Sequence, residues 1–272
     1  MSNLRPNRIG HSLHLGLNFV DPDHYGGWDG KLYACENDAR DMQILADSQG
    51  YQSTLLLRKE VTRKNVKDFL YKSAQELVTG DILLVTYSGH GSHVPDLNND
   101  ERDARDETLC LYDGQIIDDE LLLHWSKFQE GVRILVISDS CHSGDITRER
   151  FRPKKTTEFA SKDQPFEYAF KTYMQNKDFY DSINLRKEGE VEIEATVRLI
   201  SACQENQLAY DGMINSVFTQ KLLYIWNGGK YDQDYSRFHR DILDIMPPEQ
   251  TPNHLVFGQS NPRFAAEPPF KI

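Results

Sequence analysis

The chain has 272 residues, of which 39% are hydrophobic and 27% are charged, so it can bury the core of one large domain or two small ones. A formal net charge of −11 argues against nucleic acid or an anionic membrane as the main partner, and it suits a basic peptide or a divalent cation. We expect no membrane association, because no apolar run could span a bilayer and no apolar stretch follows the first basic residues as in a secretory signal. Four sparse cysteines without a CxxC pair favour a reducing, cytoplasmic location over a disulfide scaffold or a structural zinc site.

Hydrophobic periodicity predicts strands and helices that alternate along most of the chain. Residues 11–20 alternate between apolar and polar and predict a strand, and a glycine-rich loop follows over 21–34. The elements expected after this loop are a helix over 36–48, a strand over 53–58, a helix over 62–78, a strand ending at Ser88, an acidic loop over 94–107, a short strand over 108–112, a helix from Asp118, a strand ending at Asp139, a strand over 196–201, helices over 216–227 and 235–245, and a last strand over 254–258. This alternation predicts an α/β fold with a mainly parallel, doubly wound sheet and helices on both faces.

Residues 145–195 interrupt the pattern of strands and helices. They are polar, mixed in charge and poor in strand signal. They also carry a basic cluster, which comprises Arg148, Arg150, Arg152, Lys154 and Lys155. We interpret this stretch as a long surface excursion between two parts of one sheet, within a single domain over 1–272.

Two short polar strings follow the two most apolar strand patterns. They are Tyr87-Ser88-Gly89-His90-Gly91 and Asp139-Ser140-Cys141-His142-Ser143-Gly144. A histidine and a cysteine therefore lie where strands leave an α/β sheet, which is where such sheets place catalytic groups. A thiol with a distant histidine is the minimum set for a nucleophile and its base, and this chemistry requires no cofactor. The amides of Gly91 and Cys141 are candidate oxyanion donors.

Strand geometry adds two further side chains to this set. Side chains two residues apart on a strand point the same way, so Ser88 should share a direction with His90, and Asp139 with Cys141. His142 should point away from Cys141 and is a poor candidate base. The imidazole is needed because a thiol with a pKa near 8.5 is only a few per cent ionised at neutral pH.

The two strings resemble the histidine and cysteine blocks of caspase-like cysteine peptidases, most closely metacaspases and their bacterial relatives, the orthocaspases. The resemblance includes Cys35-Glu36-Asn37-Asp38 and returns at Ser201-Ala202-Cys203 and Phe218-Thr219. It implies a caspase-like fold and hydrolysis of peptide bonds by a dyad of Cys141 and His90. It also implies a large-subunit-like part over about 11–145, a linker over about 146–195 and a small-subunit-like part over about 196–272.

The resemblance further implies cleavage after arginine or lysine. The positions that match the acidic S1 pocket of metacaspases are Cys35, Asp38, Ser88 and Asp139. The chemistry agrees, because paired carboxylates attract a guanidinium or an ammonium and repel an aspartate side chain. Two alternatives stay open: Asp38 on a helix surface, and a basic pocket for aspartate formed by Arg40 or Arg198, neither of which the spacing links to the dyad.

An acidic stretch over 96–107 raises the question of calcium. Glu101 occupies the position where an EF-hand loop needs glycine, so we reject that motif. The resemblance implies activating Ca²⁺ bound through Asp106, Asp118 and Asp119, although the family's further aspartate falls at about Arg148. The alternative is that Asp118 and Asp119 only favour the start of a helix.

Several functional hypotheses remain open from the sequence. The basic run over 148–155 is a candidate site of self-cleavage, and the metacaspase resemblance favours a monomer. The main alternative to a peptidase is a catalytically inactive caspase-like scaffold or regulatory binding protein. A hydrolase of another acyl compound and a zinc hydrolase are further alternatives, the latter because His90 and His93 form an HxxH pair.

Overall fold

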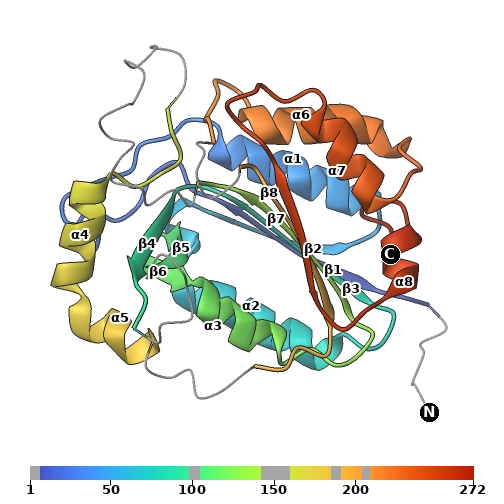
Figure 1. Ribbon diagram of the computed structural model, residues 1–272, viewed down its shortest axis with the longest axis horizontal. Helices are drawn as coiled ribbons and strands as arrows, with labels where there is room; N and C mark the ends of the chain where they lie inside the picture. The colour runs from blue at the N-terminus through green and yellow to red at the C-terminus, as the bar shows by residue number, and fades with distance from the viewer. Residues whose placement is uncertain (1–6, 98–104, 142–159, 185–190, 204–208) are drawn as a thin grey trace.

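The computed structural model describes residues 7–97, 105–141, 160–184, 191–203 and 209–272, and it is built on a six-stranded sheet (Figure 1). The strand order is β2-β1-β3-β7-β8-β9, in which only β9 runs antiparallel to its neighbour. The strands of this sheet are β1 (Gly10–Gly16), β2 (Gln52–Leu57), β3 (Ile82–Ser88), β7 (Arg133–Asp139), β8 (Thr196–Ser201) and β9 (Asn253–Gly258). The mainly parallel α/β sheet is confirmed, although its first strand ends at Gly16 and not at residue 20.

The sheet is covered on both faces, which explains the continuous apolar runs of its central strands. Every residue of β3 and β7 is buried. Alternate side chains enter opposite cores: Leu83 packs with one hydrophobic cluster and Leu84 with the other. Strands that are buried on both sides cannot show the alternation of a half-exposed strand.

Two sets of helices form the outer layers (Figure 1). On one face lie α1 (Cys35–Ser48), α6 (Val217–Trp226) and α7 (Tyr235–Leu243), and on the other lie α2 (Arg63–Glu76) and α3 (Asp118–Trp125). Three short helical segments connect or follow these elements: η1 (Arg58–Glu60), η3 (Asn227–Gly229) and α8 (Pro262–Ala266). The first face packs Met42 and Phe218 into its core, and the second packs Val66 and Trp125.

A second, smaller unit at the carboxyl edge of the main sheet was not predicted as such. It is an antiparallel sheet of β4 (Gly91–Pro95), β5 (Arg105–Leu111) and β6 (Gly114–Ile117). The loop expected over 94–107 thus contains the end of β4 and the start of β5. Short strands of mixed polarity carry too weak a period to be separated from a loop.

The interpretation of 145–195 as a surface excursion was wrong for the described residues 160–184. This stretch contains α4 (Phe166–Gln175) and α5 (Lys177–Asn184), and Lys162, Gln164 and Tyr180 are completely or nearly completely buried in it. The polar composition of this stretch predicted exposure to solvent. Its polar groups can nevertheless be buried, because they are hydrogen-bonded to the rest of the fold.

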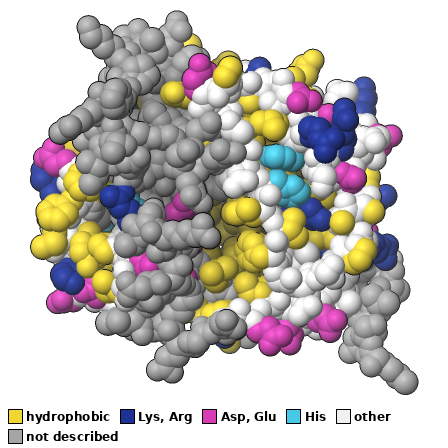
Figure 2. Space-filling model, viewed as in Figure 1, with side chains coloured by type: hydrophobic (Ala, Val, Ile, Leu, Met, Phe, Trp, Pro, Cys, Tyr) yellow, Lys and Arg dark blue, Asp and Glu magenta, His cyan; other side chains and the backbone are white. Residues whose placement is uncertain are grey.

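The last strand forms one edge of the main sheet. Leu255 and Val256 on β9 are about half exposed. In Figure 2, hydrophobic side chains gather near the middle of the visible surface of the molecule, and charged side chains lie around its rim. Within the described ranges, no helix is both long and apolar enough to cross a membrane.

Candidate active site

The register of two central strands places the predicted histidine and cysteine at the same edge of the sheet. β3 and β7 are parallel neighbours in which Ser88 is paired with Asp139. His90 and Cys141 each follow two residues later, so the segments after β3 and β7 leave the sheet side by side. Both residues are buried, with 4% and 0% of their surfaces exposed.

His90 is oriented by a main-chain carbonyl. Its Nε2 lies 2.9 Å from the carbonyl oxygen of Gly30, to which it donates a hydrogen bond, and its ring centroid lies 4.6 Å from that of Trp28. Because Nε2 carries the proton, Nδ1 is the basic nitrogen, and it makes no hydrogen bond to the described residues. Burial lowers the pKa of His90 to about 4, against the opposing effects of the Gly30 carbonyl and the Asp163 carboxylate.

The thiol of Cys141 is enclosed by the segment that precedes α6. The amide of Ala209 donates to Sγ at 2.7 Å, and Sγ lies 3.4 Å from the carbonyl oxygen of Ala209. Burial raises the pKa of the Cys141 thiol well above its usual value, and neighbouring Cys203 raises this pKa further. The arrangement therefore favours a neutral thiol and a neutral imidazole over the ion pair.

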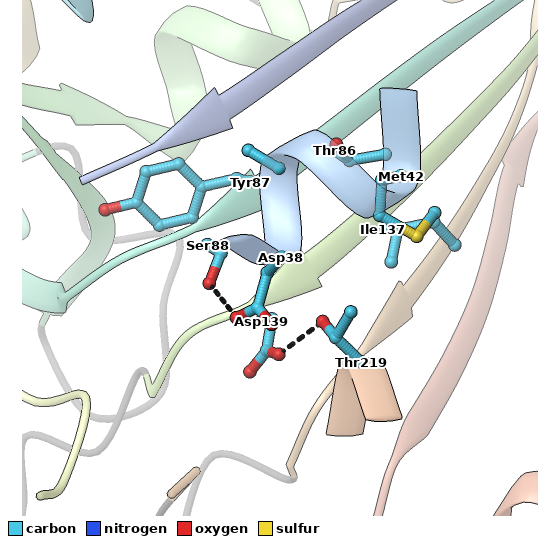
Figure 3. Close-up of a pocket in the computed structure, with 9 residues that line it drawn as sticks. Asp38, Met42, Thr86, Tyr87, Ser88, Ile137, Asp139 and Thr219 are labelled. Atoms are coloured by element: carbon cyan, nitrogen blue, oxygen red, sulfur yellow. Dashed lines mark hydrogen bonds between the residues drawn. The ribbon is translucent and has the colours of Figure 1, made fainter. Parts of the chain in front are cut away.

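An acidic pocket is lined by the last residues of β3 and β7, two positions before His90 and Cys141 (Figure 3). Four separate elements contribute polar side chains to its lining, among them Asp38 from α1, Ser88 from β3, Asp139 from β7 and Thr219 from α6. Ser88 donates to Asp38 at 2.7 Å, and Thr219 donates to Asp139 at 2.7 Å. Three of the four positions predicted for the S1 pocket therefore line one cavity.

The two carboxylates are also joined by Ser216. Its hydroxyl lies 2.7 Å from Oδ2 of Asp38 and in contact with Oδ2 of Asp139, and its amide donates to Asp38 at 3.0 Å. Burial raises the pKa of Asp38, and the nearby Asp139 carboxylate raises it further, whereas the Lys162 ammonium acts in the opposite direction. Two carboxylates that are both ionised in so enclosed a space cost free energy unless a positive charge compensates them. The pocket therefore favours a cation.

A lysine of the same chain provides this cation. Lys162 is fully buried, and its Nζ lies 3.0 Å from Oδ1 of Asp139, 2.9 Å from Oγ of Ser88 and 3.5 Å from Oδ2 of Asp38. Cys35, the fourth predicted pocket residue, is close enough to interact electrostatically with this ammonium. Burial opposes the charge on Lys162, but the surrounding acidic groups outweigh it and raise the pKa of the ammonium.

The main chain of Lys162 meets the two predicted oxyanion donors. The amides of Gly91 and Cys141 both donate to the Lys162 carbonyl oxygen, at 3.0 and 3.3 Å. Two donors that converge on one carbonyl oxygen are the arrangement that stabilises the oxyanion of an acyl-transfer intermediate. The structure thus gathers the cysteine, the histidine, both amides and the acidic pocket around one residue.

Other predicted residues lie elsewhere. Asp106 is on β5, and Asp118 and Asp119 begin α3. Within the described ranges, no three His, Cys, Asp or Glu side chains gather closely enough to hold a metal ion. The side chain of His93 stacks on Phe166, with ring centroids 6.3 Å apart.

The alternative basic pocket for aspartate is not supported. Arg40 is exposed on α1, and Arg198 lies over the rings of Tyr235 and Phe264. Neither arginine lines the acidic pocket. The run over 148–155, proposed for self-cleavage, lies outside the described residues.

Sequence reasoning missed several residues of the site. Lys162 and Ala209 carry no motif, and Gly30 was taken only as part of a loop. Asp211 was also missed; its carboxylate accepts from the amides of Tyr33 and Ala34 and fixes the chain before α1. Ser216 could have been suspected, because it lies two residues before the Phe218-Thr219 motif.

Comparison with known proteins assigns this arrangement to a class. The family model described as "Caspase domain" matches residues 19–266, and the chain belongs to this family of caspase-like peptidases. Its curated relatives point to the metacaspase branch: Metacaspase-1A of Neurospora crassa is 33% identical over 50% of this chain and 32% of its own length. Metacaspase-1 of Saccharomyces cerevisiae is 27% identical over 76% of this chain and 45% of its own length. The chain thus spans less than half the length of these relatives.

Solved structures agree with the fold. Protein GSU0716 from Geobacter sulfurreducens superposes with a TM-score of 0.89 at 46% identity, covering 97% of this chain and 98% of the other. Caspase-1 from Spodoptera frugiperda gives a TM-score of 0.55 at 10% identity over 95% and 92% of the two chains. The second likeness shows the caspase-like fold alone.

Proposed function

We propose that this chain is a cysteine endopeptidase that hydrolyses peptide bonds after arginine or lysine. The observation that carries the proposal is the position of Lys162, whose ammonium is paired with Asp139 and whose carbonyl oxygen meets the amides of Gly91 and Cys141. A P1 residue of a substrate needs these two contacts at once. In the intact chain Lys162 supplies the cation that faces Asp38 and Asp139, and under the proposal a basic P1 side chain takes that place.

In the proposed reaction, Nδ1 of His90 removes the proton from Cys141, and the thiolate attacks the carbonyl carbon of the P1 residue. The developing negative charge on the carbonyl oxygen is stabilised by the two converging amides, an effect worth roughly 3–4 kcal/mol per donor. The imidazolium then protonates the leaving amine. Water hydrolyses the thioester, and its proton returns through His90.

No cofactor enters these steps, because the nucleophile, the base and the oxyanion donors all belong to the chain. Under the proposal, the partners are basic peptides or proteins. We also propose that the chain is a monomer. A reducing, cytoplasmic compartment suits its four cysteines, which are all free and buried. Calcium is proposed only as an activator, outside the chemical step.

A positional peptide library that varies P1, assayed with wild type and Cys141→Ala, tests the proposal. We expect hydrolysis with arginine or lysine at P1 and complete loss in Cys141→Ala. Hydrolysis confined to aspartate at P1 would contradict the specificity. Absence of Cys141-dependent hydrolysis of every peptide in the library would favour the scaffold alternative.

A further inference from the structure

Three arginines are buried in the described part of the chain, and one of them has no carboxylate partner. Arg63 is held by both carboxylate oxygens of Glu120, at 2.7 and 2.9 Å. Arg133 lies 2.6 Å from Oε2 of Glu267. Arg198 on β8 is equally enclosed, with 5% of its surface exposed, but it forms no ion pair with a described residue. A buried guanidinium without an anion costs free energy, so Arg198 is the arginine that lacks compensation.

The contacts of Arg198 leave one edge of its guanidinium unpaired. Nη1 lies 3.2 Å from Nε2 of His254 on β9, whereas Nε is buried without an acceptor and Nη2 has none among the described residues. The group lies over the rings of Tyr235 and Phe264, 5.3 and 5.0 Å from their centroids, and such contacts stabilise a cation less than a carboxylate does. Burial lowers the pKa of Arg198, against the opposing effects of Tyr235 and the exposed Asp234.

Two histidines form a cluster with Arg198. The rings of His254 and of His239 on α7 lie 5.5 Å apart, both side chains are half-buried, and Nε2 of His239 donates to the Pro252 carbonyl at 3.0 Å. In Figure 2, histidine side chains lie together on the visible surface. An arginine only donates, so Nε2 of His254 is the acceptor and its Nδ1 carries the proton. Burial, followed by the charge of Arg198, lowers the pKa of His254 to about 4, in agreement with a neutral ring.

We infer that Arg198, His254 and His239 form a binding site, between α7 and β9, for the carboxylate of a small organic molecule. The Nε–Nη2 edge presents two parallel N–H bonds, which match the two oxygens of one carboxylate. Nδ1 of His254 is a third donor. Because His254 is neutral, the single charge of Arg198 is balanced by one carboxylate. None of these residues lines the acidic pocket, and the inference is independent of the proposed peptidase activity.

The strand register adds an apolar contact to this site. Val256 is paired with Arg198 across β8 and β9, so the two side chains lie on the same face of the sheet. Val256 is 52% exposed. A ligand with an apolar body beside its carboxylate can cover this side chain and remove apolar surface from water. We therefore expect benzoate to bind more tightly than acetate or inorganic phosphate.

Titrations with sodium benzoate, sodium acetate and sodium phosphate test the inference, with sodium chloride keeping the ionic strength constant. The readout is the Cε1–H resonance of His254 in proton–carbon correlation spectra, assigned with the variant His254→Gln. In wild type we expect a saturable shift with benzoate at a Kd of about 1 mM, and binding at least about threefold weaker with acetate and phosphate. Arg198→Met should abolish the saturable shift. Arg240→Met, which removes an exposed arginine from the same helix as His239, should behave as wild type.

Titration calorimetry gives a second measurement, which does not depend on a histidine resonance. Arg198→Lys keeps the positive charge and loses the planar fork, so benzoate should bind at least about tenfold more weakly than to wild type. His254→Gln retains an acceptor for Nη1 and loses the Nδ1 donor, so its affinity should fall about 3- to 10-fold. Circular dichroism shows which variants are folded; if Arg198→Met is not, Arg198→Lys decides the outcome.

Two results would overturn the inference. They are the absence of any saturable response of wild type to the three anions, and equal affinities for benzoate in wild type and in the folded variants of Arg198. Tighter binding of phosphate than of benzoate would contradict the assignment to organic carboxylates. Peptide hydrolysis enters none of these measurements, so the site can fail while the proposed peptidase activity stands, and the reverse is equally distinguishable.

Discussion

The Lys162 ammonium and the Asp139 carboxylate form an ion pair of 3.0 Å, in which the two side chains are 0% and 2% exposed. A buried pair of this kind is weak evidence for stability, because the loss of solvation offsets much of the attraction. Removing one partner is different, since it leaves a buried charge and costs about 3–5 kcal/mol. The pocket thus requires a cation, which either the chain or a substrate can provide.

Asp38 should be a specificity residue, and Asp41 supplies a matched control. Both accept a hydrogen bond from Nδ2 of Asn215, but only Asp38 lines the pocket. In the activated enzyme, Asp38→Asn should lower kcat/KM for lysine and arginine peptides by about 10- to 100-fold, as expected from loss of a charge-assisted contact. Asp41→Asn should leave kcat/KM unchanged. Equal losses in the two variants would point to a general effect on α1.

Thr219 should act by holding Asp139 in place. Its hydroxyl donates to Oδ2 of Asp139 at 2.7 Å, and both residues are buried. Thr219→Val keeps the shape and removes the donor, so we expect a loss of about 1–3 kcal/mol in the free energy of unfolding, measured in urea. KM for a lysine peptide should rise more than kcat falls. A fall in kcat alone would place Thr219 in the chemical step.

Stability should fall in mild acid because of buried neutral histidines. Burial lowers the pKa of His14 to about 3, from 6.5 when the imidazole is exposed. Between these values the unfolded chain binds the proton and the folded chain does not, so stability falls as the pH falls from about 7. Each such histidine should cost about 2 kcal/mol between pH 7 and pH 5.

The variant His14→Gln isolates this contribution. It should reduce stability at pH 7, because His14 hydrogen-bonds to Thr86 and Ser12, but the difference between pH 7 and pH 5 should shrink by about 2 kcal/mol. Urea unfolding at the two values measures both effects. An unchanged difference would mean that His14 takes up a proton in the folded protein.

Calcium should act on activation and not on catalysis. A chelator should delay the onset of hydrolysis by the freshly prepared wild-type chain, and it should leave the steady-state rate of the activated enzyme unchanged, because no step of the proposed chemistry uses a metal. Reporter hydrolysis with and without EGTA measures both, with magnesium as the control cation. A steady-state rate of the activated enzyme that requires calcium would contradict this division.

Local patterns were sufficient for the strands that carry the predicted dyad. The apolar runs before Ser88 and before Asp139 are strands because both faces of the sheet are covered, and their shared register brings His90 and Cys141 to one edge. The smaller sheet and α4 and α5 were missed, because their short or polar stretches lack a strong period.

The amino-acid sequence by itself determined the main sheet, the thiol, the imidazole and the two carboxylates, because strand periodicity and short motifs are local properties. Only the tertiary structure decided what fills the pocket. Lys162 is separated from Asp38 by 124 positions, and nothing in its own neighbourhood distinguishes it from an exposed lysine. Its role arises from burial beside Asp139, since a cation without water needs a carboxylate, and that pairing exists only once the chain has folded.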